Sequence, residues 1–212
     1  MQTILVLGGH ATGCKQSLLN RYVENTFPQT HKLIGVRFKS KAVEHDGAQI
    51  RLQIWIQGYS STYLPENLKG AHAIIVGFDV TRRDTFEEVP MWLDYIREHT
   101  SGTALIYLVG NQIDLVSKRV VSQAEMREFA ALHPMLRDER VHETSAKTGQ
   151  GVKELFSSMT AQLLTTARRA AHEKWTEQRQ AAGGKHGRAL LGPAHTETWD
   201  HLRHVRPGAV RR

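Results

Sequence analysis

The sequence contains a single cysteine, Cys14, among its 212 residues. One cysteine excludes an internal disulfide bond and a zinc site built from four cysteines. No apolar run approaches the roughly 20 residues that a helix needs to span a bilayer. Residues 1–7 lack both the basic segment and the long apolar segment of a secretory signal peptide. Together these absences favour a soluble, cytoplasmic protein.

Acidic residues are scarce near the C-terminal end. Residues 165–212 hold ten Lys or Arg and four acidic residues, so six of the seven net positive charges lie there. Such charge can attract anionic lipid, an acidic protein surface or nucleic acid. Charges spread this widely are more typical of a solvated helix face and a soluble tail. We expect no specific nucleic-acid binding, and only weak peripheral contact with a membrane through Trp199 and the basic residues. The twelve scattered histidines predict no metal site.

The apolar pattern predicts strands that alternate with helices. Strands are predicted at 3–7, 36–45, 48–55, 73–78 and 104–109. Helices are predicted at 16–24 and 86–96, from 123, and from 151 onward. Continuous apolar runs are typical of strands buried on both faces of a parallel sheet, and Asp46-Gly47 is a two-residue hairpin signal. The alternation implies a doubly wound α/β sheet with its ligand at the carboxyl ends of the strands.

Local signals refine the helices. Pro90 is tolerable in its helix only near the first turn. Ser122 and Glu125 form a capping box that opens the next helix. The apolar stripe of the last helix continues to Trp175, and glycines and Pro193 interrupt the pattern from 181. We therefore predict a nucleotide-binding domain at 1–165, an extension of the last helix at 166–180, and a basic, mostly disordered tail at 181–212.

The loop after the first strand reads Gly9-His10-Ala11-Thr12-Gly13-Cys14-Lys15-Gln16-Ser17. It approximates the pattern G-x-x-x-x-G-K-[ST], in which backbone N–H groups and a helix N-terminus hold phosphates and the Lys neutralises their charge. Gly9 and Lys15 match, whereas Cys14 takes the second glycine position and Gln16 the hydroxyl position. A register from Gly8 to Gly13 fits the glycines but places Cys14 at the lysine.

The same loop has plainer interpretations. A glycine turn that feeds a helix without any ligand explains the pattern about as well, with Lys15 capping a carbonyl. Cys14 is either a reactive thiol at a helix N-terminus or a small structural residue.

Other segments decide between these interpretations because they occur in one order and spacing. They are Leu52-Gln53-Ile54-Trp55, Gly70 to Val76, Phe78-Asp79-Val80-Thr81, Phe86, Trp92-Leu93, Val109 to Leu115 and Glu143 to Gly149. In combination they closely resemble the Rab branch of the Ras superfamily of small GTPases, over about residues 1–165. The resemblance implies an α/β P-loop NTPase fold, the small GTPase G domain, with a six-stranded, mostly parallel sheet flanked by helices. It also implies GTP or GDP as ligand, and a protein effector or a larger complex as partner.

The resemblance implies a nearly complete pocket for the guanine base. Asn111-Gln112-Ile113-Asp114 matches N-K-x-D, in which the carboxylate accepts hydrogen bonds from guanine N1–H and N2–H. Gln112 replaces the Lys whose stem covers the base, a change also found in a branch of the Rho family. Ser145-Ala146-Lys147 matches the loop whose backbone N–H meets the guanine oxygen, and Phe27 takes the place of an aromatic beside the base. Asp114 and Ser145 can also persist merely as braces of these loops.

The phosphate and metal side departs from the family. Magnesium requires oxygen ligands in octahedral geometry, and the resemblance places Gln16, Leu33 and Ile56 where the family has its ligands. The segment between Trp55 and Gly70 keeps no D-x-x-G-Q, so the water-orienting Gln is replaced by Tyr59 or Ser60. Cys14 puts a Cβ where glycine is favoured, and Thr12 occupies a further glycine position. Hydrolysis depends on metal, Lys and an oriented water, so we expect a slow or inactive enzyme with no catalytic residue assigned.

Three hypotheses follow. In the first, the chain is an atypical Rab-like protein that binds GTP or GDP, with doubtful dependence on Mg²⁺. In the second, it is a nucleotide-free pseudo-GTPase that serves as a scaffold or adaptor subunit. In the third, it is an ordinary vesicle-traffic GTPase that uses a partner's residues for hydrolysis. This hypothesis is disfavoured because the sequence ends without the cysteines on which Rabs are normally prenylated. The first assigns nucleotide contact to Gly9, Thr12, Gly13, Cys14, Lys15, Gln16, Ser17, Phe27, Asn111, Gln112, Asp114, Ser145, Ala146 and Lys147.

Overall fold

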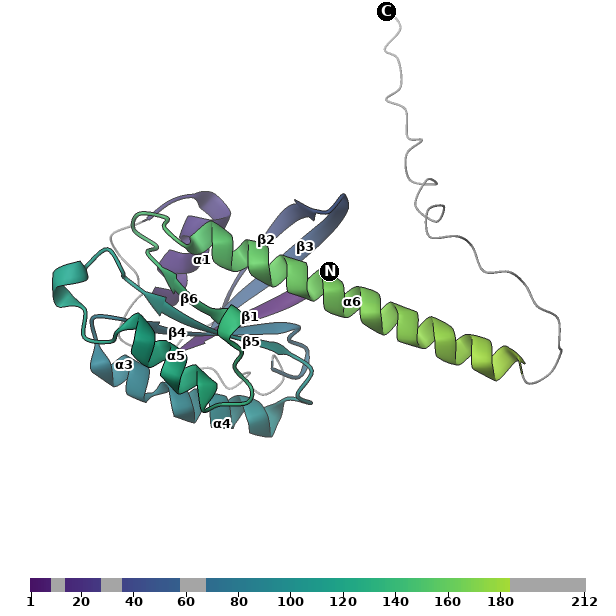
Figure 1. The fold of residues 1–212 in the computed structure, drawn as a ribbon. Coiled ribbons are helices and arrows are strands. Elements are labelled where there is room, and N and C mark those ends of the chain that lie inside the picture. The colour runs from purple at the N-terminus through teal and green to yellow at the C-terminus, as the bar shows by residue number, and fades with distance from the viewer. Residues whose placement is uncertain (9–13, 28–35, 58–67, 184–212) are drawn as a thin grey trace, which may run out of the picture. The chain divides into compact units, whose positions relative to one another are not determined.

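The computed structural model describes residues 1–8, 14–27, 36–57 and 68–183. The chain divides into two compact units, Met1–Arg168 and Arg169–Arg212. Among the described residues, six strands form one sheet in the order β2-β3-β1-β4-β5-β6 (Figure 1). The strands are β1 Gln2–Gly8, β2 Val36–His45, β3 Ala48–Gln57, β4 Ala73–Asp79, β5 Leu105–Asn111 and β6 Val141–Thr144. This is the predicted α/β fold.

Only the β2–β3 pair of this sheet is antiparallel. Asp46 (φ +49°) and Gly47 (φ +71°) both adopt the left-handed conformation that a tight hairpin turn requires. Every other neighbouring pair is parallel, with β1 between β3 and β4. Parallel neighbours need crossover connections, and the helices supply them.

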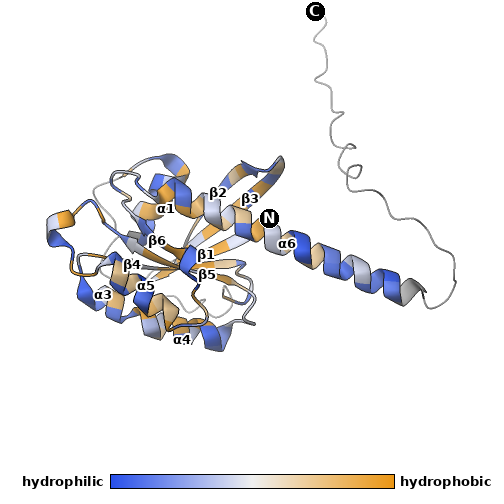
Figure 2. Cartoon of the chain, in the orientation of Figure 1, coloured by the Kyte–Doolittle hydropathy of each residue, from blue (hydrophilic) through white to orange (hydrophobic). Residues whose placement is uncertain are grey.

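Helices cover both faces of the sheet (Figure 1). They are α1 Cys14–Glu24, α3 Arg83–Glu87, α4 Val89–His99, α5 Gln123–Ala131 and α6 Val152–Gly183, with short 3-10 turns η1 Val116–Lys118 and η2 Asp138–Arg140. In β1, Ile4 and Val6 pack with α1 and the start of α6, whereas Leu5 and Leu7 pack with α3, α4 and α5. Figure 2 shows the apolar strands between the two layers. Burial on both faces explains why the strands are continuously apolar.

The helix predicted at 86–96 is wrong in one respect, because the structure breaks it into two. α3 ends at Glu87, Glu88 lies between the helices, and α4 begins at Val89. Pro90 therefore falls in the first turn of α4, where its missing N–H leaves no intrahelical bond unmade. The expectation that Pro90 is tolerable only near the first turn of a helix is confirmed, and it explains why a helix begins at Val89.

Only one of the two reciprocal hydrogen bonds of the predicted capping box is found at the start of α5. Ser122 Oγ accepts a hydrogen bond from the Glu125 N–H at 3.1 Å. The Glu125 carboxylate, which the pattern expects at the Ser122 N–H, instead forms an ion pair with the guanidinium of Arg83 on α3. The Glu125 side chain thus joins α5 to α3, and both helices cover the same face of the sheet.

The last helix ends three residues later than expected, at Gly183. Its predicted stripe is confirmed, since Val152, Leu155, Phe156, Met159 and Leu163 are all buried. Beyond Arg168 the helix is mostly hydrophilic (Figure 2). The boundaries proposed at 165 and 180 stay predictions, and the tail from 184 lies outside the described residues. No helix in the described part of the chain combines the length and the apolar character needed to cross a membrane.

Candidate nucleotide-binding site

The predicted site residues lie just beyond the carboxyl ends of parallel strands. α1 follows β1, Asn111 ends β5, and Ser145 follows β6. Because these strands run parallel, the segments that leave them emerge at the same edge of the sheet. The fold therefore brings together sequence motifs that are more than a hundred residues apart.

Asn111 holds the two base-side loops together. Its side chain is buried, and Oδ1 accepts hydrogen bonds from the Ala146 N–H at 3.0 Å and from Thr144 Oγ1 at 3.1 Å. Asn111 and Thr144 are register partners on β5 and β6. These two hydrogen bonds to Asn111 Oδ1 fix the position of the Ser145-Ala146-Lys147 loop, because breaking either one leaves a buried polar group unpaired.

Asp114 is braced, and its side chain is partly buried, with 14% exposed. Its Oδ1 accepts a hydrogen bond from Ser145 Oγ at 2.7 Å, and Ser145 Oγ in turn accepts one from the Thr148 N–H at 3.0 Å. The Lys147 ammonium lies 3.9 Å from Asp114 Oδ2 and is largely exposed. A carboxylate offers about four lone-pair sites. The frame thus orients Asp114 and leaves it able to accept further hydrogen bonds.

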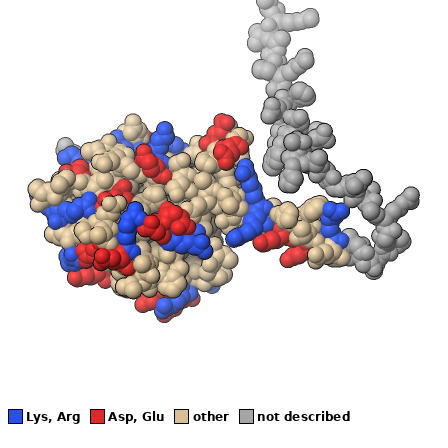
Figure 3. Space-filling model, viewed as in Figure 1, with Lys and Arg blue, Asp and Glu red and all other residues tan. Residues whose placement is uncertain are grey.

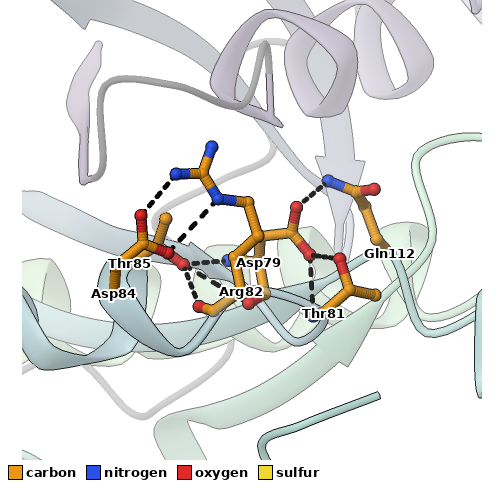
Figure 4. A network of polar contacts seen from close by, with 6 residues as sticks. All are labelled: Asp79, Thr81, Arg82, Asp84, Thr85 and Gln112. Carbon is orange, nitrogen blue, oxygen red and sulfur yellow. Dashed lines mark hydrogen bonds and ion pairs between the residues drawn. The ribbon is translucent and has the colours of Figure 1, made fainter. Parts of the chain in front are cut away.

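Gln112 is tied to the end of β4. Its backbone has a φ of +71°, a conformation that is uncommon for a residue with a side chain. Its Nε2 donates to Asp79 Oδ2. Asp79 Oδ1 accepts from the N–H and the hydroxyl of Thr81, at 2.8 and 2.6 Å (Figure 4). The side chain of Gln112, which stands where the family has lysine, is thereby held by a hydrogen bond to the buried Asp79.

Arg21 of α1 clamps the same loop from another side. Its Nε donates to the Ala146 carbonyl at 2.7 Å, and Nη2 donates to the Lys147 carbonyl at 2.6 Å. Nη1 donates to the carbonyl of Asn25 at 3.1 Å. Sequence reasoning missed Arg21 and Asp79 as site residues. Asp79 stood within a quoted motif, but Arg21 lies 125 residues from its partner and carries no local signal.

Glycine and lysine shape the end of β1. Gly8 has a φ of +126°, and a Cβ there would lie 1.9 Å from the Gly77 carbonyl oxygen, so only glycine fits. Lys15 is buried in the first turn of α1, and its Nζ donates to the Gly8 carbonyl at 2.5 Å. An ammonium has three donors, so a bond from Lys15 to the Gly8 carbonyl is compatible with a second bond to a phosphate. Gly9, Thr12 and Gly13 lie outside the described residues, and Cys14 begins α1.

Gln16 and Ser17 are both buried. Gln16 Nε2 donates to Asn20 Oδ1 at 2.6 Å, and the same oxygen accepts from Lys39 Nζ at 2.6 Å. Gln16 Oε1 is buried and has no hydrogen-bond partner in the structure as described. The amide of Gln16 is therefore held from one side only.

The described residues include no ligand set for a magnesium site of the family type. Ile56 is fully buried in the core between the sheet, α1 and α6, and it offers no oxygen ligand. Leu33 lies outside the described residues. Within the described ranges, no three His, Cys, Asp or Glu gather where they can hold a metal ion. On the base side, the contact of the predicted site residues with guanine stays a prediction.

Phe27 lies just past α1 and is 38% exposed. The Thr26 N–H donates to the Asn20 carbonyl, and Asn25 has a φ of +54°, so the chain turns sharply before Phe27. Contact between Phe27 and a base stays a prediction.

Comparisons with known proteins bear on the family of the chain. The Ras family model matches residues 3–165. The Ras-related protein RabF1 of Dictyostelium discoideum is 36% identical over 156 residues, which cover 73% of this chain and 80% of the relative. The GTP-binding protein YPT1 of Saccharomyces cerevisiae is 34% identical over 184 residues, which cover 85% of this chain and 87% of the relative. The chain therefore belongs to the Ras family and is a Rab-like member of it.

Proposed function

We propose that this chain binds GTP or GDP and that its magnesium-dependent hydrolysis is impaired. The observation that carries the proposal is the braced Asp114, whose Oδ1 is held by Ser145 while Asn111 fixes the adjoining loop. Guanine presents N1–H and N2–H side by side, and adenine does not. A carboxylate positioned in advance for two such donors discriminates strongly between the bases.

The loop also suggests which amide meets the guanine oxygen. The N–H groups of Ser145, Ala146, Thr148 and Gly149 are committed to the Gln150 carbonyl, Asn111, Ser145 Oγ and the Ser145 carbonyl, respectively. Within the described part of the chain, the Lys147 N–H is the amide of this loop for which no acceptor is found. It is the candidate donor, and the Arg21 bond to the Lys147 carbonyl restricts the same residue.

Impaired hydrolysis is proposed from the phosphate side. Efficient phosphoryl transfer needs a metal ion and an oriented water. Ile56 offers no ligand, and Gln16 is committed to Asn20 through its amide nitrogen. Nucleotide would then be held by the base pocket, Lys15 and the N-terminus of α1 with little help from a cation.

Nucleotide content is the direct test. The purified full chain is denatured, and the released supernatant is resolved by ion-exchange chromatography against GTP, GDP and ATP standards. Near-stoichiometric GTP is the expected result. GDP would contradict the impaired hydrolysis, whereas an empty site that also fails to bind millimolar GTP or GDP in calorimetry would contradict nucleotide binding.

A protein partner is proposed for the face formed by β2 and β3. Phe38 is 46% exposed although it is aromatic, and its ring centroid lies 4.9 Å from that of Trp55. Exposed aromatic residues supply much of the binding energy at protein interfaces. Such an effector-type partner fits a role of the chain in intracellular transport complexes in the cytoplasm.

The same face supports the second candidate, a nucleotide-free scaffold. It requires only the partner surface, and the burial of Ile56 in the core is consistent with a site that no longer switches. Nucleic acid is not proposed as a partner. In Figure 3 the Lys and Arg side chains of the visible face are interspersed with Asp and Glu and form no continuous basic patch.

A further inference from the structure

A pocket of about 470 Å³ lies between α1, β2 and the first turns of α6. Its volume falls within the range of roughly 300–1,000 Å³ that is typical of small-molecule sites. The pocket includes Arg21 and Gly149, but not the residues that frame Asp114. It is therefore a separate space that adjoins the guanine-recognition loop.

The pocket has an aromatic wall. The rings of Tyr22 and Phe156 are stacked with their centroids 3.6 Å apart and their planes 8° apart. Val43 and Val152 add aliphatic surface. Phe156 is buried against the Tyr22 ring, and the Lys41 ammonium also lies over that ring, so a ligand meets ring edges and aliphatic side chains and not an open aromatic face. This apolar lining favours a ligand with an aromatic or aliphatic body.

The charges around the pocket favour an anionic group on that ligand. Arg21, Lys41 and Lys153 line it, against one carboxylate from Glu44. The Lys41 ammonium lies 4.2 Å from the centroid of the Tyr22 ring and donates to the Tyr22 carbonyl at 2.5 Å. Burial raises the pKa of Tyr22 to about 12, so its phenol stays neutral at physiological pH and adds no charge that would repel an anion.

Arg21 connects the pocket to the guanine-recognition loop. Its guanidinium bonds the carbonyls of Ala146 and Lys147, as described above. Its stem packs beside Gly149, since a Cβ built there would lie 3.6 Å from Arg21 Cδ. A guanidinium has five N–H donors, so an anion in the pocket can add an acceptor while the loop carbonyls stay bonded. Such an anion would restrict Arg21, and through it the loop.

We propose that this pocket binds a small amphipathic anion, and that its occupancy rigidifies the loop Ser145–Gly149 through Arg21. The pocket is a regulatory site distinct from the nucleotide site. Where the chain holds nucleotide, linkage requires the probe and the nucleotide to change each other's affinity by the same factor.

The first test uses the aromatic sulfonate dye 1-anilinonaphthalene-8-sulfonate with the full chain, freed of nucleotide. Saturable binding of one dye per chain is expected in a fluorescence titration. Ser157 is an exposed pocket residue, and Ser157→Trp should fill the mouth and weaken dye affinity by at least about tenfold. Thr165→Trp is the matched control, because Thr165 is an exposed hydroxyl residue of α6 that does not line the pocket.

The second test measures transmission to the loop by hydrogen exchange. Amides of residues 145–149 should exchange several-fold more slowly when the dye is bound. Arg21→Lys keeps the positive charge but lacks the planar fork that holds two carbonyls. Its dye affinity is measured first, and exchange is then compared at saturating dye in both proteins. In Arg21→Lys the dye should no longer slow exchange in the loop.

These results separate the proposal from the proposed nucleotide binding, because neither needs nucleotide. Equal dye affinity in Ser157→Trp and Thr165→Trp would overturn the pocket assignment. Dye binding that leaves loop exchange unchanged, or accelerates it, would overturn the coupling. An empty nucleotide site, on the other hand, would leave both readouts intact.

Discussion

The base side and the phosphate side of the candidate site are built differently. On the base side, hydrogen bonds join Asn111 to Thr144 and Ala146, and Asp114 to Ser145. On the phosphate side, Ile56 is absorbed into the core and Gln16 keeps a buried oxygen without a described partner. Under the proposed function, the contrast means that recognition of a ligand and chemistry on it can be lost separately, because different loops carry them.

The strongest test of the comparison is Asp114→Asn, given that guanine nucleotide binds. An amide presents N–H where guanine also presents N–H, so affinity for GDP should fall by roughly a thousandfold or more. Xanthine carries a carbonyl in place of the guanine N2 amine, so the affinity for XDP should fall much less than the affinity for GDP. Calorimetry with both nucleotides checks this, and parallel losses for GDP and XDP would show that Asp114 serves only as a loop brace.

The next effect comes from an attempt to restore the phosphate side. Ile56→Asp introduces a carboxylate where the family ligand stands, but the side chain is fully buried. We expect the free energy of unfolding to fall by about 3 kcal/mol or more, because the charge has no described partner there. Urea unfolding measures this, with Ile56→Val as the control, which should cost only about 1 kcal/mol. A stable Ile56→Asp variant with magnesium-dependent hydrolysis would mean that the site is closer to active than proposed.

A smaller loss is expected for Asn111→Ala. The substitution leaves the Ala146 N–H and the Thr144 hydroxyl unpaired in a buried place, which should cost about 2 kcal/mol of stability. Ser101→Ala, at an exposed loop position, should change stability by less than about 0.5 kcal/mol. If the two variants unfolded at the same urea concentration, the rigidity of the base side would be in doubt.

The smallest effect is expected from removing magnesium. Chelation with EDTA should change nucleotide affinity by less than about threefold, since the described residues supply no family-type ligand set. A competition assay with and without 5 mM EDTA (roughly the excess needed to strip a weakly held divalent ion) gives the answer. A large loss of affinity would show that residues outside the described ranges complete a metal site.

Most of the fold was predictable because it follows from local patterns, whereas the base-side residues rest on the resemblance of their motifs to the family and stay a prediction. Apolar runs identified each of the buried strands at 3–7, 73–78 and 104–109, and the Asp46-Gly47 turn identified the hairpin. The break at Glu88 was missed because apolar periodicity continues across it, and only the first-turn requirement of Pro90 pointed to a boundary. Arg21 and Asp79 were missed as site residues because their partners come from distant segments. The partner of the Glu125 carboxylate likewise depends on how α3 and α5 pack.

The position of β1 also has a consequence for how the chain folds during synthesis. β1 is made first, yet its partners begin with Gln2 opposite Leu52 and Ile4 opposite Ala73. The β2–β3 hairpin is the one sheet pairing that local contacts alone can form, and local contacts form early. One edge of the first strand therefore stays unpaired until β3 has emerged from the ribosome, and the other edge until the chain beyond residue 79 has emerged. Pulse-labelled hydrogen exchange during refolding should protect the hairpin amides before those of β1.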